Sequence, residues 1–132
     1  MRPPSHAIAI HLDANGVGTL GATSGWRLAA NVEEATPDDA ITVYDTGGSA
    51  PVLFDEQLTA PTIQVRTRSH DYAGAYDKQR EAFGVLNAII NQVIDGNRYL
   101  GAWLTSDIIH IGRDENDRHL LTANYQIERV ET

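Results

Sequence analysis

One long amphipathic segment between Asp71 and Ile94 constrains the fold of this chain more than any other feature of the sequence. Its apolar side chains recur at three- and four-residue steps, which predicts one helix of about six turns. Asp71 is suited to cap its start, and the Asp-Gly-Asn segment at 95–97 supplies a glycine for its end. An apolar helix face of this length must pack on a partner layer. The residues expected on that face are Tyr72, Ala75, Gln79, Ala82, Phe83, Leu86, Ile89, Ile90 and Val93.

The partner layer is predicted by segments in which apolar and polar residues alternate with a period of two. We expect strands over residues 26–32, 40–45, 61–69, 99–104, 107–112 and 121–128. In the first strand Trp26, Leu28, Ala30 and Val32 share a face, and in the last Leu121, Ala123, Tyr125 and Ile127 point inward. Ile109 and Ile111 are expected to be their partners across the final hairpin.

The N-terminal segment is compatible with two kinds of element. Ile8, Ile10 and Leu12 alternate as in a strand, while Ile8 and Leu12 also share a helical face. Two prolines, then Ser5 as an N-cap and Asn15-Gly16 as a stop, favour a short helix from about Ser5 to Ala14. The expected fold class is α+β, with one mixed, mostly antiparallel sheet, the helix between Asp71 and Ile94 and the short N-terminal helix packed on it. We expect residues 1–132 to form a single domain.

Composition excludes several classes of protein. Ten Lys and Arg face 18 Asp and Glu, a net charge of −8, which argues against a reader of duplex DNA. There is no cysteine, so disulfides, thiolate nucleophiles and zinc fingers are absent. No apolar run approaches the roughly 20 residues that cross a bilayer, and the run at 7–10 is too short for a signal peptide. We expect synthesis in the cytosol and no membrane contact.

Motifs for catalysis or cofactors are not found. His110 and His119 flank the final hairpin close to Asp114 and Asp117 and are the one candidate metal cluster, but polar residues at a solvated turn explain them better. Gly47-Gly48 lacks the downstream Gly-Lys-Ser/Thr of a phosphate-binding loop, and no Gly-x-Ser-x-Gly elbow is present. We therefore expect no enzymatic activity, no cofactor and no metal.

Charge is distributed unevenly along the chain. Between Leu28 and Val65 there are seven acids and no Lys or Arg, whereas four basic residues follow directly. Either both groups are solvated faces, or the acidic loops of one protomer meet the basic strand and helix of another in a head-to-tail contact that closes into a ring. The acids are Glu33, Glu34, Asp38, Asp39, Asp45, Asp55 and Glu56, and the basic residues are Arg66, Arg68, Lys78 and Arg80.

Three ordered segments resemble a known family. They are PDDAITVYDTGGSAP, PTIQVRTRSHDYAGAYDKQREAFGVLNAI and GRDENDRHLLTANYQIERVE, with a weaker GVGTLG near the N-terminus. Together they are similar to the bacteriophage minor capsid or tail terminator family of long-tailed phages, from about Pro37 to Glu131. The residues that carry the resemblance are Tyr44, Asp45, Gly47, Gly48, Gln64, Arg66, Arg68, Tyr72, Tyr76, Asp114 and Arg118.

The resemblance implies a small α+β virion protein that assembles as a homo-oligomeric ring, expected to be a hexamer. Such a protein caps the tail tube, stops polymerisation of the tube protein and presents the surface that joins the head connector, with no catalytic residues. It is expected at the head-proximal end of the tail, and in the host cytoplasm during assembly. The alternatives are a head–tail connector or stopper protein one layer nearer the capsid, and a small-molecule binding module, which would need a concave pocket.

Two sets of residues are assigned roles in this ring. We expect the acidic loops to line a channel through which DNA passes without specific binding, because carboxylates repel phosphate. The lumen residues are Glu33, Glu34, Asp38, Asp39, Asp55 and Glu56. Arg66 and Arg68 are predicted to face a neighbouring subunit, and Lys78 and Arg80 belong to the same predicted interface.

Overall fold

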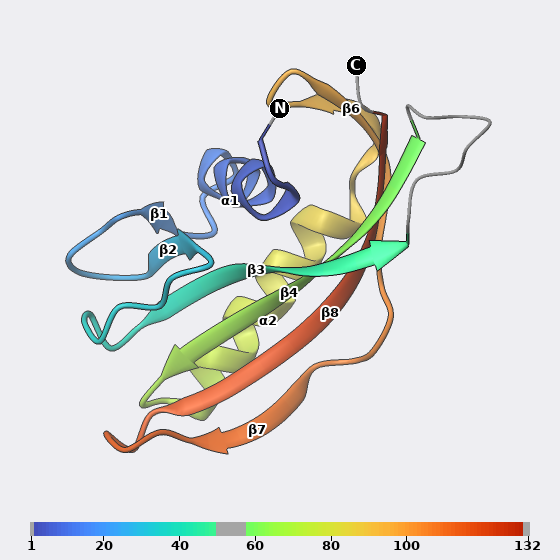
Figure 1. The fold of residues 1–132 in the computed structure, drawn as a ribbon. Coiled ribbons are helices and arrows are strands. Elements are labelled where there is room, and N and C mark those ends of the chain that lie inside the picture. Colours follow the sequence, from blue (N-terminus) through green and yellow to red (C-terminus); the bar gives the residue numbers. More distant parts are fainter. Residues whose placement is uncertain (1, 50–57, 131–132) are drawn as a thin grey trace.

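The structure, a computed structural model, describes residues 2–49 and 58–130, which form two helices and one eight-stranded sheet (Figure 1). The elements are α1 Pro4–Ala14, β1 Thr19–Leu20, β2 Arg27–Ala30, β3 Ala40–Ser49, β4 Leu58–Ser69, α2 Tyr72–Asn87, β5 Ile90–Ile94, β6 Asn97–Leu104, β7 Ile109–Arg113 and β8 His119–Val130.

The sheet is mixed and mostly antiparallel, as the sequence predicts. Its strand order is β1-β2-β3-β4-β8-β6-β5, with β1, β2 and β3 parallel and the remaining pairs antiparallel. β7 also pairs with β8, so β6 and β7 lie one after the other along the same edge of that strand. The expected neighbours β2 and β3 do pair, and the α+β fold class is confirmed.

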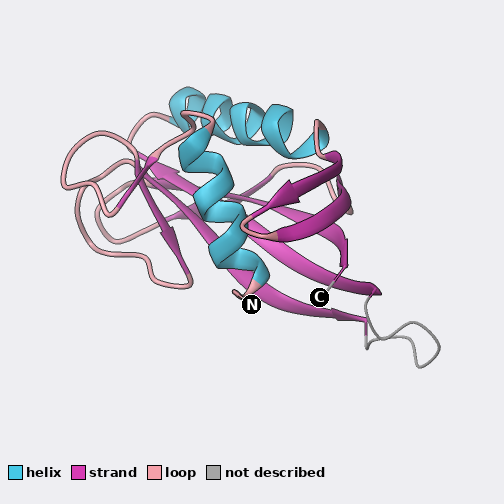
Figure 2. Cartoon of the chain, turned by 90° about the horizontal axis from the view of Figure 1, so that it is seen from above, coloured by secondary structure: helices cyan, strands magenta, loops and turns pink. Residues whose placement is uncertain are grey.

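Both helices cover one face of this sheet (Figure 2). α2 packs on β4, β8 and β6, and α1 packs on β3 and β2. The side chains beneath them are fully buried and alternate along each strand, because successive residues of a strand point to opposite faces. They include Ile41 and Val43 of β3, Ile63 and Val65 of β4, and the predicted inward set Leu121, Ala123, Tyr125 and Ile127 of β8.

The opposite face of the sheet carries polar side chains. Thr42, Arg66 and Thr122 are in register across β3, β4 and β8, and Gln64 pairs with Asn124 beside them. The Nε2 atom of Gln64 donates to Oδ1 of Asn124 at 3.3 Å. This face of the sheet is therefore lined by hydroxyl, amide and guanidinium groups instead of apolar side chains.

The predicted helix over 71–94 is too long, because α2 ends at Asn87 and the chain turns into β5. Ile94 pairs with Asn97 across a two-residue turn, Asp95-Gly96, in which both residues have positive φ angles of 50° and 81°. That is the conformation of a type I′ hairpin turn, for which Asp-Gly is a preferred sequence. Ile90 and Val93 are consequently exposed instead of lying on the helix face.

The final hairpin also departs from the predicted pattern. Ile109 and Ile111 are exposed, although the sequence predicts them inward. A register shift between His110 and Gly112 sets His110, and not Ile111, opposite Leu121 of β8. One extra residue at such a bulge moves the following side chains to the other face of the sheet.

The first predicted strand is shorter than expected, and the N-cap of α1 differs. β2 ends at Ala30, and Val32, predicted to share a strand face with Leu28 and Ala30, lies beyond the strand and is exposed. The N-cap of α1 is Pro3, and Ser5 lies inside the helix, where it is buried. Asp71 is the N-cap of α2 as predicted, but its side chain makes no capping hydrogen bond.

The Gly47-Gly48 pair lies within β3 instead of ending a strand. The ladder between β3 and β4 shifts between Asp45 and Gly47, and both glycines have positive φ angles, of 97° and 113°. A Cβ atom on Gly48 would lie 2.4 Å from the carbonyl oxygen of Ala60. Glycine is required here because the two backbones approach too closely for a side chain.

Candidate assembly site

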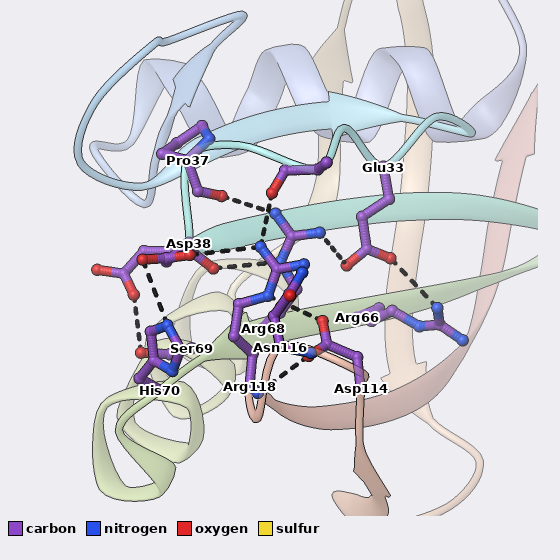
Figure 3. Close-up of polar contacts among 12 residues, drawn as sticks. Glu33, Pro37, Asp38, Arg66, Arg68, Ser69, His70, Asp114, Asn116 and Arg118 are labelled. Atoms are coloured by element: carbon purple, nitrogen blue, oxygen red, sulfur yellow. Dashed lines mark hydrogen bonds and ion pairs between the residues drawn. The ribbon is translucent and has the colours of Figure 1, made fainter.

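Arginine and carboxylate side chains converge at one end of the sheet (Figure 3). The carboxylates come from the connection between β2 and β3 and from the turn between β7 and β8, and the guanidinium groups come from β4 and that turn. We call this group the arginine–carboxylate cluster. Its members are Glu33, Asp38, Asp114, Arg66, Arg68 and Arg118.

Glu33 is the carboxylate that joins the two arginines of β4. Its Oε1 lies 3.2 Å from Nη1 of Arg68, and its Oε2 lies 3.2 Å from Nη1 of Arg66. The hydroxyl of Tyr44 also donates to Oε2 of Glu33 at 3.2 Å, and the Arg66 guanidinium lies over the Tyr44 ring. Burial, reinforced by the negative charge of Glu33, raises the pKa of Tyr44 above its ordinary value. The phenol therefore stays protonated and donates.

Arg68 is buried, with 3% of its surface exposed. Its guanidinium binds backbone carbonyls of the acidic connection between β2 and β3. Its Nη2 donates to the Pro37 carbonyl at 2.7 Å and its Nε donates to the Asp38 carbonyl at 3.2 Å. Burial lowers the pKa of its guanidinium, and the charge of Glu33 opposes that change. A buried charge is tolerated only when it is paired and hydrogen-bonded, and Arg68 satisfies both conditions.

Arg118 fixes the same connection from the turn before β8. Its Nη1 donates to the carbonyl of Ala35 at 2.6 Å and lies 3.5 Å from Oδ1 of Asp38. Its Nε donates to Oδ2 of Asp114 at 2.8 Å. The bond to Ala35, made by a side chain that is 5% exposed, ties the final hairpin to the connection that leads into β3.

Asp114 organises the turn that carries Arg118. Its Oδ1 accepts hydrogen bonds from the backbone N–H groups of Asn116 and Arg118, both at 3.0 Å. Burial alone would raise the pKa of this carboxyl, but the hydrogen bonds from Arg118 and Asn116 outweigh burial and hold the pKa below its ordinary value. Asp114 is therefore a charged acceptor at neutral pH.

A second polar group explains the aspartate of the Tyr-Asp-Thr-Gly-Gly motif. Asp45 of β3 accepts hydrogen bonds from the backbone N–H of Ser5 at 2.9 Å and from its hydroxyl at 2.6 Å. The side chain of Asn31 bridges both residues, because its Nδ2 donates to the Ser5 hydroxyl and its Oδ1 accepts from the Asp45 N–H. A carboxylate at the first turn of α1 interacts favourably with the free N–H groups there.

The structure separates the predicted basic interface into two faces. Arg66 and Arg68 lie in the arginine–carboxylate cluster and contact Glu33 of their own chain, while Lys78 and Arg80 lie on α2 over the other face. Lys78 donates to the carbonyl of Val17 at 2.8 Å, and Arg80 is exposed, with its guanidinium over the Phe83 ring. Contact of these four residues with another copy stays a prediction.

Some of the predicted lumen acids are held within the chain. Glu33 and Asp38 belong to the cluster, Asp39 accepts a hydrogen bond from the Ser69 hydroxyl at 2.7 Å, and Glu34 is exposed. Asp55 and Glu56 lie outside the described residues. The assignment of this acidic set to a lumen stays a prediction.

Arg118 is a member of the cluster to which sequence reasoning assigns no role beyond the resemblance. It lies in a turn rich in Asp and Asn, where an arginine side chain is expected to be exposed to solvent. Its partners Ala35 and Asp38 lie about 80 positions away in the chain, so no local pattern indicates the contact. Its place in the resembling segment is the one indication of a special role.

In the part of the chain that the structure describes, no group of three or more His, Asp or Glu side chains could hold a metal ion. A surface cavity of about 320 Å³ between α1 and the edge of the sheet is lined by Arg2, His6, Ala9, Ile10, Leu20 and Ala30. Neither described helix is long and apolar enough to span a membrane.

The fold and the cluster define an α+β protein in which buried arginines hold the connection between β2 and β3 and the turn between β7 and β8. The sequence matches the bacteriophage tail terminator protein family over residues 11–131. The chain therefore belongs to that family and is a structural protein of the phage tail, which confirms the resemblance seen in the sequence. The further designation as a minor capsid protein stays a prediction.

Solved structures agree with this assignment at the level of the fold. A chain from the virion of a native gene transfer agent particle superposes with a TM-score of 0.69 at 10% identity, covering 96% of this chain and 94% of that one. A second solved chain reaches a TM-score of 0.46 at 12% identity over 76% of this chain and 77% of its own, which is too distant to inform the fold. A search of curated proteins finds no significant match.

Proposed function

We propose that this protein closes the head-proximal end of the phage tail tube, stops polymerisation of the tube protein and presents the surface that receives the head connector. The support for this proposal is the family match, which extends over nearly the whole described chain. The protein acts as a virion component, and it meets its tube and connector partners in the host cytoplasm during assembly.

The capping unit is a homo-oligomeric ring, with a hexamer as the expected form. A head-to-tail contact that closes on itself generates such a ring. A ring of this kind leaves a central opening, so DNA passes through without specific binding. No catalytic step and no cofactor are part of this function.

The acidic connection between β2 and β3 faces the opening in this proposal. The three carboxylates of the arginine–carboxylate cluster are balanced by its three guanidinium groups, so the negative excess comes from Glu34 and Asp39, the further acids of the connection. Arg68 and Arg118 hold the connection by its backbone carbonyls, which fixes where that charge lies. A fixed negative lining repels phosphate and lets the duplex slide.

Charge reversal tests the lining. Glu34→Lys changes an exposed acid of the connection, and Asp107→Lys is its matched control at an exposed acid between β6 and β7, away from the cluster. We expect Glu34→Lys to slow DNA ejection and lower the phage titre while tails assemble normally, and Asp107→Lys to change neither. Normal ejection and titre with Glu34→Lys would refute the lumen assignment.

Deletion of the gene tests the capping role. Without a terminator, tails should grow overlong and stay detached from heads in electron micrographs. Tails of normal length beside filled heads would point instead to a connector or stopper protein one layer nearer the capsid. Binding of the purified protein to isolated tail tubes, or to connectors on the portal, separates the same two functions.

The third candidate, a small-molecule binding module, has the cavity beside α1 as its site. At about 320 Å³ this cavity is at the small end of ligand pockets, and Arg2 and His6 are its charged or ionisable lining residues. A metabolite that co-purifies with a monomeric protein would favour this function over capping.

A further inference from the structure

We propose that His110 and His119 form a two-histidine site for a divalent transition-metal ion on the hairpin of β7 and β8. The two side chains come from neighbouring antiparallel strands. His110 is opposite Leu121 and His119 lies two residues before Leu121, so both imidazoles lie on the face of the sheet that carries the helices. This is the cluster for which the sequence alone favours no metal.

The distance between the two ring nitrogens fits a metal ion. Nε2 of His110 lies 3.2 Å from Nδ1 of His119. In a tetrahedral zinc site each nitrogen lies about 2.05 Å from the ion, so two ligands of one ion are about 3.3 Å apart. The two nitrogens therefore already have the spacing of a shared ion. Without metal they are joined by one N–H···N hydrogen bond; with metal each ring carries its proton on its other nitrogen.

The bulge in β7 creates this arrangement. Arg113 pairs with His119, and continuing that register without a shift would set Ile111 opposite Leu121. His110 would then point to the other face of the sheet, away from His119. The extra residue between His110 and Gly112 brings the two imidazoles to the same side.

Tyr72, the first residue of α2, holds both rings from one side. Its ring meets that of His110 edge-on at 5.0 Å and that of His119 edge-on at 5.4 Å, each at 89°. Rings fixed by packing lose less conformational freedom when a ligand binds. Contact with the half-exposed Tyr72 ring therefore restricts the two imidazoles before the ion arrives.

The chemistry of the pair selects the class of ion. Neutral imidazole nitrogen is a ligand for Zn²⁺, Ni²⁺ and Cu²⁺, whereas Mg²⁺ and Ca²⁺ take oxygen ligands. The described residues supply no third histidine or carboxylate to this pair, and both side chains reach solvent, so water completes the coordination. The ion would join β7, an edge strand paired only with β8 among the described strands, to the strand that crosses the core.

Zinc titration of the purified chain tests the site, with Zn²⁺ alone as the probe. We expect the wild-type protein to bind one Zn²⁺ in calorimetry and to gain thermal stability, and Mg²⁺ to do neither. His110→Ala and His119→Ala should each weaken zinc binding roughly tenfold or more, since changing even an outer partner of a metal ligand costs that much. His6→Ala, at an exposed histidine of α1, is the matched control and should bind as the wild type does.

Paramagnetic Ni²⁺ supplies a second measurement that does not depend on stability. It should broaden the NMR signals of Tyr72, His110 and His119 in the wild-type chain and leave those of the His119→Ala variant sharp. The proposal is overturned if Zn²⁺ binds His110→Ala as tightly as wild type, or if the wild-type protein takes up no Zn²⁺ below millimolar concentration. Circular dichroism of each variant confirms that it is folded.

Discussion

At the scale of single residues, the position of a charge in the fold decides its effect on stability. Arg68 and Arg113 each form an ion pair, with Glu33 and Asp117 respectively. The Arg68 side chain is 4% exposed, whereas those of Arg113 and Asp117 are 57% and 75% exposed. Water screens an exposed pair, but removing one partner of a buried pair leaves an uncompensated charge.

We therefore expect Arg68→Ala to lower the free energy of unfolding by about 3–5 kcal/mol. Besides the ion pair with Glu33, it removes the bonds to the Pro37 and Asp38 carbonyls. Arg113→Ala, the matched control, should cost no more than about 0.5 kcal/mol. Urea unfolding of both variants measures the difference. Equal losses would mean that Arg68 contributes no more than a surface pair.

The carboxyl of Asp114 predicts how stability depends on pH. Its pKa is lower in the folded chain, so the unfolded chain binds more protons as the solution becomes acidic. The stabilisation it gives is fully present above the ordinary aspartate range near about pH 4 and is lost as the pH falls through the folded-state pKa. Asp114→Asn should be less stable at neutral pH and lose less stability on acidification. Parallel curves from about pH 7 to 3 in thermal unfolding would contradict this.

At the scale of elements, replacing each of two glycines by alanine should change the stability of the protein in opposite directions. Gly84 is an exposed residue inside α2 with open space around it, and Gly96 occupies the second position of the β5–β6 turn at a φ of 81°. Gly84→Ala should stabilise the protein by roughly 0.5–1 kcal/mol, because alanine restricts the unfolded chain and favours helix. Gly96→Ala should destabilise it by about 1–2 kcal/mol, because a Cβ is strained at that φ. Thermal unfolding compares the two, and a stable Gly96→Ala variant would argue against the type I′ turn.

The same turn explains why the sequence predicts α2 better at its start than at its end. Ile89, Ile90 and Val93 continue the helical spacing of the preceding residues, so periodicity alone extends the helix to Ile94. The Asp95-Gly96 pair is a hairpin signature, yet it also fits a helix stop. In the strands, alternation correctly identifies the inward residues of β8, but a bulge such as that at His110 leaves no mark in the pattern.

The arginine–carboxylate cluster was only partly predictable for a related reason. Charge counting singles out Glu33, Arg66 and Arg68 as unusual. It cannot tell whether they meet within one chain or between two, because that depends on the strand order that places β3 beside β4. The contact of Arg118 with Ala35 depends in addition on how the final hairpin folds over the sheet.

At the scale of the whole molecule, the intrachain pairs determine which variants can test ring formation. Replacing Arg66 and Arg68 by Glu would set new carboxylates against Glu33 and would disturb the connection between β2 and β3. A weaker ring could then result from a disturbed fold of the single chain as well as from a lost subunit contact. The predicted interface is better tested at Arg80, which is exposed on α2 and contacts the Phe83 ring.

Arg80→Glu reverses one charge and should cost the monomer only about 0.5–1 kcal/mol through the lost cation–π contact. If α2 faces a neighbouring subunit, the head-to-tail contact then loses an attractive charge and gains a repulsive one, so the ring should dissociate at higher protein concentration than wild type. Light scattering over a dilution series measures this, with and without tail tubes. Arg113→Glu is the control, since its charge change lies on β7, outside the predicted interface. If the Arg80→Glu ring dissociates at the same concentration as the wild-type ring, this part of α2 is not in the subunit contact. If both variants dissociate alike, the effect is due to net charge.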